Sequence, residues 1–197
     1  MDKRQSIIQA ARARFRHYGL QKTTMQEIAT DADVAVGTLY RYFKDKDELF
    51  VACTDEFIAQ HQRQIEELLA IEQPADQKLR QYLEGRFNVA REVSTSSTHA
   101  AELARAVFRV KPQRLQEEAM MMEAALIQIM EQGNRANLWH IEEPKRDARV
   151  LLFSIAHFFP NATMNIAHWP TIENFRFVVD WFIETWKRTW SDLQRAS

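Results

Sequence analysis

Apolar residues recur at helical spacing along most of this chain, and capping residues mark where successive helices begin. In the first segment Ile7, Ala11 and Phe15 fall on one face of a helix, which Asp2 can cap and Gly19 can end. No stretch alternates apolar and polar residues over a useful strand length. The pattern predicts an all-α fold with about nine helices. The later helices are expected at residues 25–33, 36–43, 46–71, 76–93, 98–110, 113–132, 144–159 and 172–193.

Short polar motifs and single glycines set several of the expected helix ends. Thr24 and Glu27 can form a capping box at the second helix, and residues 45–48 can form another at the fourth. Asp33 lies in the turn between the second and third helices, where aspartate tolerates a left-handed backbone. Gly133 is expected to end the seventh helix.

Composition and charge are those of a globular protein with a slightly basic beginning. The 197 residues are 46% hydrophobic and include only 4 glycines and 5 prolines, which disfavours sandwiches, barrels and glycine-rich nucleotide-binding folds. The net charge is −1. Residues 1–50 carry nine bases and seven acids, whereas the remainder carries seventeen bases and twenty acids. A mildly basic head therefore precedes a mildly acidic body.

Several classes of site and location are disfavoured by what the sequence lacks. Cys53 is the single cysteine, so an internal disulfide and a cysteine-based zinc site are excluded, and we expect it to pack as a small apolar residue. The first residues are polar and the most apolar run, 150–159, is too short to span a bilayer. We expect a cytoplasmic protein without membrane contact, metal or cofactor. No HExxH, P-loop, GxGxxG or GxSxG motif suggests an enzyme.

The third helix has the chemistry of a DNA-reading element. Leu39 and Phe43 lie four residues apart and can face the core, while Thr38, Arg41 and Tyr42 fall toward the other side. Hydroxyl and guanidinium groups can reach base edges and phosphates. Two further residues suit a phosphate backbone: Gly37 would let it approach closely, and Lys46 lies at the start of the fourth helix.

The stretch TMQEIATDADVAVGTLYRYFKDKDEL, residues 24–49, resembles the tetracycline-repressor (TetR) family of bacterial transcription regulators. The resemblance implies a three-helix helix-turn-helix DNA-binding domain at residues 1–47 and a helical effector-binding and dimerisation domain at 48–197. This sequence differs from the usual pattern of the family at Asp33, where glycine is common, and at Ala35, where serine or threonine often caps the recognition helix. The implied DNA-binding residues are Thr24, Gly37, Thr38, Tyr40, Arg41, Tyr42 and Lys46.

The last two long helices are expected to form a dimer interface. Phe177 and Trp181 lie outside the main apolar stripe of the ninth helix, so this helix needs a second partner. Phe153 belongs to the similarly apolar eighth helix. The resemblance implies that these helices pair with those of a second subunit, and two heads about 34–36 Å apart would then read two half-sites. The alternative is that Phe177 and Trp181 pack only within their own chain.

The resemblance also implies a small-molecule pocket in the body. Bulky apolar groups with a few polar ones suit an apolar or aromatic effector, although ordinary core packing is the commoner role for each such residue. The candidate lining residues are Arg105, Phe108, Met121, Trp139, His157, Phe158, Asn161 and Trp169.

The sequence therefore predicts a homodimeric, ligand-responsive transcription regulator. The leading hypothesis is a repressor that an effector releases from a palindromic DNA operator. Three alternatives remain open: a ligand-sequestering module of the same fold that has lost operator binding, an activator, and a helical enzyme without a visible motif.

Overall fold

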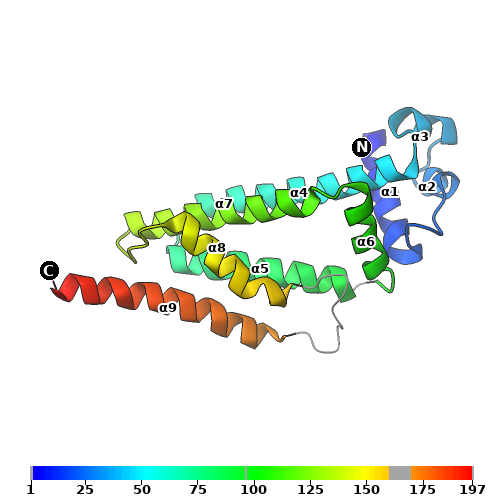
Figure 1. Ribbon diagram of the computed structural model, residues 1–197. Coiled ribbons are helices and arrows are strands. Elements are labelled where there is room, and N and C mark those ends of the chain that lie inside the picture. Colours follow the sequence, from blue (N-terminus) through cyan, green and yellow to red (C-terminus); the bar gives the residue numbers. More distant parts are fainter. Residues whose placement is uncertain (1, 96, 160–169, 197) are drawn as a thin grey trace. The chain divides into compact units, whose positions relative to one another are not determined.

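The computed structural model describes residues 2–95, 97–159 and 170–196, and this part of the chain contains helices and turns but no strand. The predicted all-α fold is confirmed (Figure 1). The elements in order are α1 (Lys3–Tyr18), α2 (Met25–Asp31), α3 (Val36–Tyr42), α4 (Lys46–Ala70), α5 (Ala75–Thr95), α6 (Ala100–Val110), α7 (Arg114–Arg135), α8 (Pro144–Ile155), the short 3-10 helix η1 (Ala156–Phe158) and α9 (Ile172–Ala196).

The predicted caps form at the N-terminal helices. Asp2 accepts a hydrogen bond from the Arg4 amide at 3.3 Å. At α2, the Thr24 hydroxyl accepts from the Glu27 amide at 3.2 Å, and the Glu27 carboxylate accepts from the Thr24 amide at 2.8 Å. Gly19 ends α1 with a φ of +82°, a backbone conformation that residues other than glycine rarely adopt.

The expected end of α7 at Gly133 is wrong, because the helix continues to Arg135. The Trp139 indole folds back onto this glycine, so that a Cβ at position 133 would lie 2.2 Å from the ring. The indole Nε1 donates to the Met130 carbonyl at 2.9 Å. Asn137, with a φ of +54°, makes the reversal instead. Gly133 thus serves packing rather than helix termination.

Other predicted helix ends also differ by a few residues. Helix α5 runs to Thr95, two residues beyond its expected end at residue 93. Helix α8 ends at Ile155, and residues up to Phe158 tighten into the 3-10 turn η1. Pro160 cannot continue a helix without losing a backbone hydrogen bond, and it lies outside the described residues. Helix ends set by tertiary packing are the least readable part of a sequence.

The chain forms two compact units, each with its own core. The first unit contains the residues up to His61 and the segment Glu92–Gln116. In its core Ile8, Phe15 and Leu39 meet Ala106 of α6. Cys53 is buried here, with its Sγ 3.7 Å from the Ile8 carbonyl oxygen. Because α4 runs without a break from Lys46 to Ala70, the predicted functional boundary between residues 47 and 48 stays a prediction.

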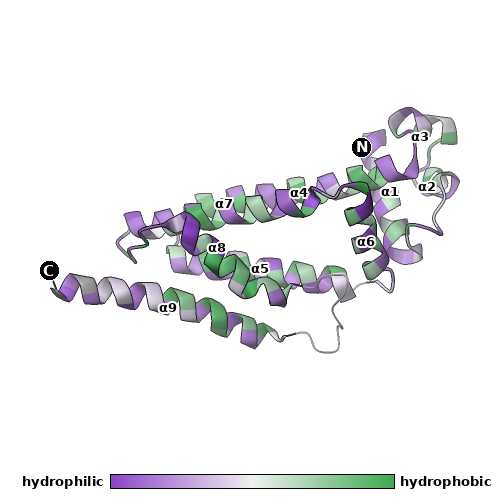
Figure 2. Cartoon of the chain, in the orientation of Figure 1, coloured by the Kyte–Doolittle hydropathy of each residue, from purple (hydrophilic) through white to green (hydrophobic). Residues whose placement is uncertain are grey.

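The second unit contains Gln62–Arg91 and the chain from Glu117 onward. Its core is lined by α5, α7, α8 and α9, and the apolar residues of α8 and of the first half of α9 stand out in Figure 2. Phe175 packs against Phe87 at 4.9 Å and Phe158 at 5.3 Å between ring centroids. The buried Lys78 donates to the Leu69 carbonyl and to Gln132, both at 2.8 Å, and so fastens the C-terminal end of α4.

Candidate functional site

Helices α2 and α3 are joined by a tight turn and have the geometry of a helix-turn-helix. Asp33 takes the left-handed backbone expected of it, with a φ of +52°, and the Val34 amide donates to the Ala29 carbonyl at 3.0 Å. Ala35 is extended and gives α3 no side-chain cap. Helix α3 is therefore positioned by the turn and by core packing rather than by a cap.

The two faces of α3 divide as the sequence predicts. Leu39 and Phe43 are 0% and 2% exposed and lie in the core of the first unit. Tyr40 on the opposite face is 51% exposed. A Cβ at Gly37 would meet nothing within 4 Å, so nothing in this chain requires glycine there. The predicted contact residues Thr38, Tyr40, Arg41 and Tyr42 together form a half-buried to exposed surface of hydroxyl and guanidinium groups.

Lys46 binds the loop that directly precedes Thr24. The Lys46 Nζ donates to the carbonyl oxygens of Thr23 at 2.8 Å and Gln21 at 3.3 Å. The first residue of α4 is thus attached to the loop that precedes α2. An ammonium group has three donors, so one N–H of Lys46 can serve an acceptor from outside. No sequence pattern predicts these carbonyl partners.

Arg14 links α1 to α2 through two carboxylates. Its Nη1 lies 3.1 Å from Glu27, and its Nε and Nη2 lie 2.5 and 3.2 Å from the two oxygens of Asp31. Hydrogen bonds from Thr24, with the Arg14 charge, hold the pKa of Glu27 below its usual value. The same guanidinium lowers the pKa of Asp31. In the sequence, this network is indicated only by the spacing of Glu27 and Asp31, which places two acids on one face of α2.

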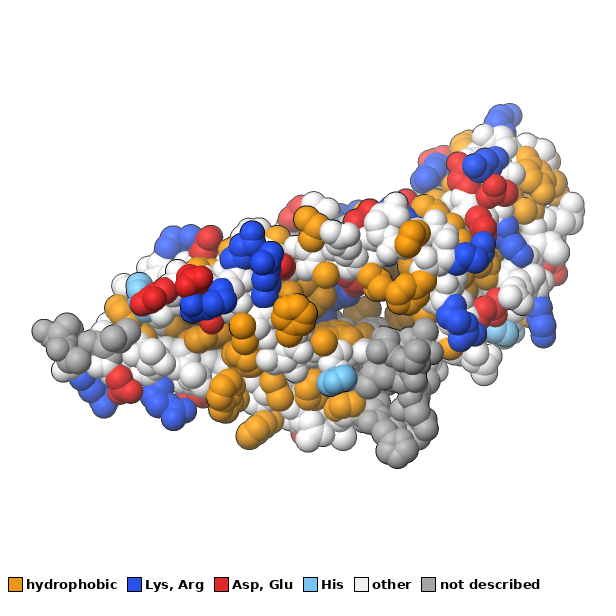
Figure 3. Space-filling view, in the orientation of Figure 1, with side chains coloured by type: hydrophobic (Ala, Val, Ile, Leu, Met, Phe, Trp, Pro, Cys, Tyr) orange, Lys and Arg blue, Asp and Glu red, His pale blue; other side chains and the backbone are white. Residues whose placement is uncertain are grey.

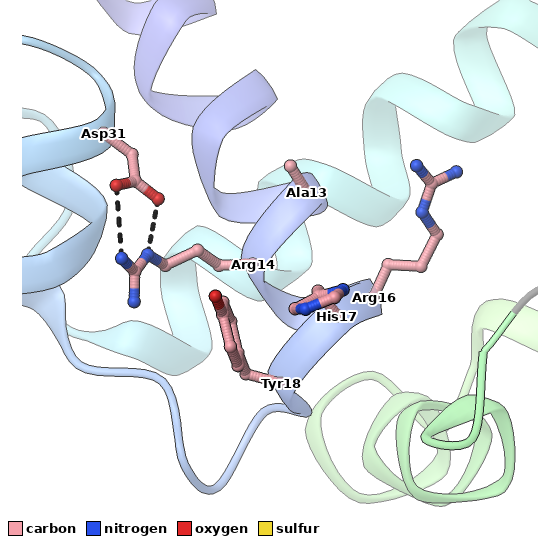
Figure 4. A pocket seen from close by; sticks show the side chains of 6 residues that line it. All are labelled: Ala13, Arg14, Arg16, His17, Tyr18 and Asp31. Carbon is pink, nitrogen blue, oxygen red and sulfur yellow. Dashed lines mark hydrogen bonds and ion pairs between the residues drawn. The ribbon is translucent and has the colours of Figure 1, made fainter.

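A surface hollow of about 450 Å³ lies beside this network, lined by Ala13, Arg14, Arg16, His17, Tyr18 and Asp31 (Figure 4). The basic groups do not converge in it. Arg14 is turned toward Asp31, whereas Arg16 points away from it on the other side of α1. The hollow is therefore a trough along α1 rather than a site built around one ligand.

The predicted effector-binding residues lie in different places. Arg105 and Phe108 are exposed on α6 in the first unit, whereas Met121, Trp139, His157 and Phe158 belong to the second. Trp139 is buried in the core, His157 is exposed, and Phe158 packs on Phe175. Asn161 and Trp169 lie outside the described residues. Neither the α1 trough nor a smaller hollow at His140 and Trp186 is lined by any of the six predicted residues that the structure describes, so the predicted pocket lining stays a prediction.

The predicted dimer residues are strongly exposed and lie on neighbouring helices. Phe153 of α8 is 81% exposed, and Phe177 and Trp181 of α9 are 72% and 55% exposed. Helices α8 and α9 contact each other, and hydrophobic side chains gather over them in Figure 3. The packing alternative for Phe177 and Trp181 leaves most of both side chains in water, which is unusual for aromatic residues.

Other kinds of site find no support among the described residues. No group of three or more His, Cys, Asp or Glu side chains there could hold a metal ion. No helix in the described ranges is long and apolar enough to cross a membrane.

The N-terminal segment has clear sequence relatives. Residues 7–53 match the model for bacterial regulatory proteins of the tetR family. A segment of 47 residues is 43% identical to the probable acrEF/envCD operon repressor of Escherichia coli K12, and it makes up 24% of this chain and 21% of that protein. The chain thus spans only about a quarter of the curated relatives it matches.

Solved structures share the fold over nearly the whole chain. A transcriptional regulator from Cytophaga hutchinsonii superimposes with a TM-score of 0.76 at 23% identity, over 91% of this chain and 95% of its own. SmeT of Stenotrophomonas maltophilia, solved in complex with triclosan, gives a TM-score of 0.70 at 18% identity, over 94% and 91% of the two chains. Residues 7–53 thus match the model for bacterial regulatory proteins of the tetR family, and the chain shares the fold of solved transcriptional regulators over nearly its whole length.

Proposed function

We propose that this protein is a homodimeric, ligand-responsive repressor that binds a palindromic DNA operator. The observation that carries the proposal is the outer face of α3, where Tyr40 and Arg41 are exposed while Leu39 fixes the helix from behind. Such a face presents donors to base edges and phosphates without disturbing the core. Lys46 and Thr24 flank it and would bind the adjoining phosphates.

The exposed aromatic residues on α8 and α9 support a second copy of the chain as partner. A two-fold axis would bring two α3 helices to two successive major grooves, and half-sites one helical turn apart lie about 34–36 Å from each other. Symmetric pairing would also cover Phe153, Phe177 and Trp181, which otherwise remain in water.

A small apolar or aromatic effector is proposed to bind the body and release DNA. The fold shared with SmeT, whose solved complex contains triclosan, supports this class of ligand. The effector must bind the released form more tightly than the DNA-competent form, and the coupling between the two ligands is reciprocal.

The test is binding to the intergenic duplex beside the protein's own gene, followed by fluorescence anisotropy. We expect tight, salt-dependent binding, and we expect Tyr40→Phe and Arg41→Ala to weaken it. Absence of binding even at low ionic strength would overturn the proposal. That result would favour the ligand-sequestering alternative, for which the missing cap at Ala35 is the one structural argument.

A screen of apolar and aromatic compounds tests the effector. A compound that binds the native protein raises its melting temperature, and the same compound should lower DNA affinity. Transcription from the promoter in the presence of the protein then distinguishes repression from activation, because the position of the operator decides between them.

A further inference from the structure

Arg4 is held at the C-terminal end of α3 although it belongs to the first turn of α1. Its guanidinium carbon lies over the ring of Phe43, 5.4 Å from the centroid. Phe43 directly follows α3 and is buried. Its ring is therefore held in place by the core and offers the arginine a fixed surface. A cation stacked on an aromatic face gains about 0.5–1 kcal/mol at an exposed site.

This stacking orders the guanidinium without using its hydrogen-bond donors. A guanidinium has five N–H donors, all in its plane, and stacking engages only the face of that plane. In the described chain the Arg4 side chain makes no ion pair or hydrogen bond, and its backbone amide donates to Asp2. Its in-plane donors are therefore available to an outside acceptor.

Three arginines of α1 and α6 are placed differently. Arg14 and Arg109 are each paired with carboxylates, Arg109 through two bonds of 2.8 and 3.0 Å to Asp47. Arg16 is exposed, but it lies in the last turn of α1, where the Ser97 hydroxyl bonds to its carbonyl. In Figure 1 this end of α1 lies toward α6, whereas the N-terminal end lies toward α3.

We propose that Arg4 binds the DNA phosphate backbone beside the recognition helix and that Phe43 positions it. This inference rests on the proposed function, since it needs α3 to dock on DNA. The planar fork of arginine matches the phosphate group and binds it through two parallel bonds. The contact adds affinity on every sequence, and it fixes the position of α3 in the groove from its C-terminal end.

The test compares Arg4→Gln with Arg16→Gln, a matched loss of one exposed charge from the opposite end of α1. DNA affinity is measured on the intergenic duplex and on an unrelated duplex between 50 and 200 mM salt. One phosphate contact contributes a slope of about 0.9 in log affinity against log salt. Between 50 and 200 mM salt, the affinity of Arg4→Gln should therefore fall about 3.5-fold less than the affinity of the native protein does. The difference should be the same on both duplexes. Arg16→Gln should leave the slope unchanged.

The positioning role of Phe43 is tested by a double-mutant cycle. Phe43→Leu keeps apolar bulk in the core but removes the ring face. In that background Arg4→Gln should cost less affinity than it does in the native protein, and Arg4→Lys should recover only part of the native affinity. Melting temperatures of all variants verify that the fold is retained.

Two failures are distinguishable. If the native protein binds no duplex, the proposed function itself fails. If it binds, and Arg41→Ala weakens it while Arg4→Gln and Arg16→Gln have the same salt slope as the native protein, the inference about Arg4 is overturned and the proposed function stands. If Arg4→Gln costs the same DNA affinity in the Phe43→Leu background as in the native protein, the positioning role of Phe43 is overturned.

Discussion

Gly37 is a glycine inside a short helix for which the chain itself supplies no reason. A Cβ there would stand in open space, and its φ is an ordinary one, since Gly19 is the single glycine in the described chain with a positive φ. Glycine in a helix costs about 0.5–1 kcal/mol relative to alanine. If α3 lies in a major groove, the missing side chain lets the sugar–phosphate backbone approach the helix.

We predict that Gly37→Ala stabilises the protein while weakening DNA binding. The free energy of unfolding should rise by up to about 1 kcal/mol. Affinity should fall about tenfold, which corresponds to about 1.4 kcal/mol, because a methyl group meets the DNA backbone. Urea unfolding and anisotropy with labelled duplex measure the two effects.

Gly85 in α5 provides the matched control, because a Cβ there would also meet nothing within 4 Å. Gly85→Ala should give a similar gain in stability and unchanged DNA affinity. Equal DNA affinity of the native protein and Gly37→Ala would contradict the docking of α3.

At the scale of residues, periodicity predicted which side chains are buried but not what the polar ones bind. The burial of Leu39 and Phe43 followed from a spacing of four residues. The partners of Lys46 are backbone carbonyls of a loop, and Arg14 meets acids from another helix. Both contacts join residues that are far apart in the sequence, and the spacing of residues within one helix does not predict such contacts.

At the scale of elements, α7 shows how a packing contact overrides a local signal. Glycine near the end of an apolar run usually terminates a helix, but at Gly133 the absent side chain makes room for the Trp139 ring. The sequence shows the glycine and the tryptophan, yet not that one lies on the other.

Gly133→Ala is therefore expected to destabilise the second unit. A methyl group 2.2 Å from the indole forces the ring or the helix to move, and such overpacking costs about 1–3 kcal/mol. Thermal unfolding of Gly133→Ala beside Gly85→Ala measures the difference. A gain in stability for both variants would show that Trp139 relocates at no cost.

Within the first unit, Asp55 of α4 binds the two basic residues Lys111 and Arg114. The Lys111 Nζ lies 3.1 Å from Asp55, and the Arg114 guanidinium bonds to the same oxygen. Burial alone would raise the pKa of Asp55, but the hydrogen bonds and charges of Arg114 and Lys111 hold it below its usual value. The carboxylate form is thus the one that stabilises the fold.

The sign of the pH dependence follows from that lowered pKa. The stabilisation is complete above the unfolded pKa of about 3.9 and is lost as pH falls through the lower folded value. Asp55→Asn should be less stable than the native protein at pH 7, and the difference should shrink below about pH 4. Urea unfolding at pH 7, 5 and 3.5 measures this.

Glu67→Gln is the control for that series, because Glu67 is exposed on the same helix without an ion pair in the described chain. Its stability difference from the native protein should stay near zero at each pH. A constant deficit of Asp55→Asn down to pH 3.5 would contradict the linkage.

At the scale of the whole molecule, the proposed dimer depends on the exposed aromatic residues of α8 and α9. Burying one phenylalanine is worth about 1.5–3 kcal/mol, and a two-fold dimer buries it twice. Phe177→Lys should therefore raise the dissociation constant of the dimer by at least about 100-fold. Sedimentation velocity measures the change, and binding to the palindromic duplex should weaken with it.

Met120 offers a control for added charge, since it is 63% exposed on α7. Met120→Lys should leave the oligomeric state unchanged. A native protein that sediments as a monomer, or a Phe177→Lys variant that remains dimeric, would contradict this interface.

The helix-turn-helix could be predicted from sequence because its residues are local and each has one structural role. The effector site could not, because its lining would come from several helices whose relative rotation depends on the whole core. Arg105 and Trp139 illustrate this, since the first is exposed on α6 and the second is buried against Gly133.

The burial of Cys53 has a practical consequence for experiments on this protein. Loss of solvation raises the pKa of its thiol to about 12, and the reactive thiolate is then almost absent at neutral pH. Maleimide dyes should react with the native protein far more slowly than with the urea-unfolded chain. One cysteine engineered on the surface could thus carry a fluorophore or spin label at a defined place, with the natural cysteine left untouched.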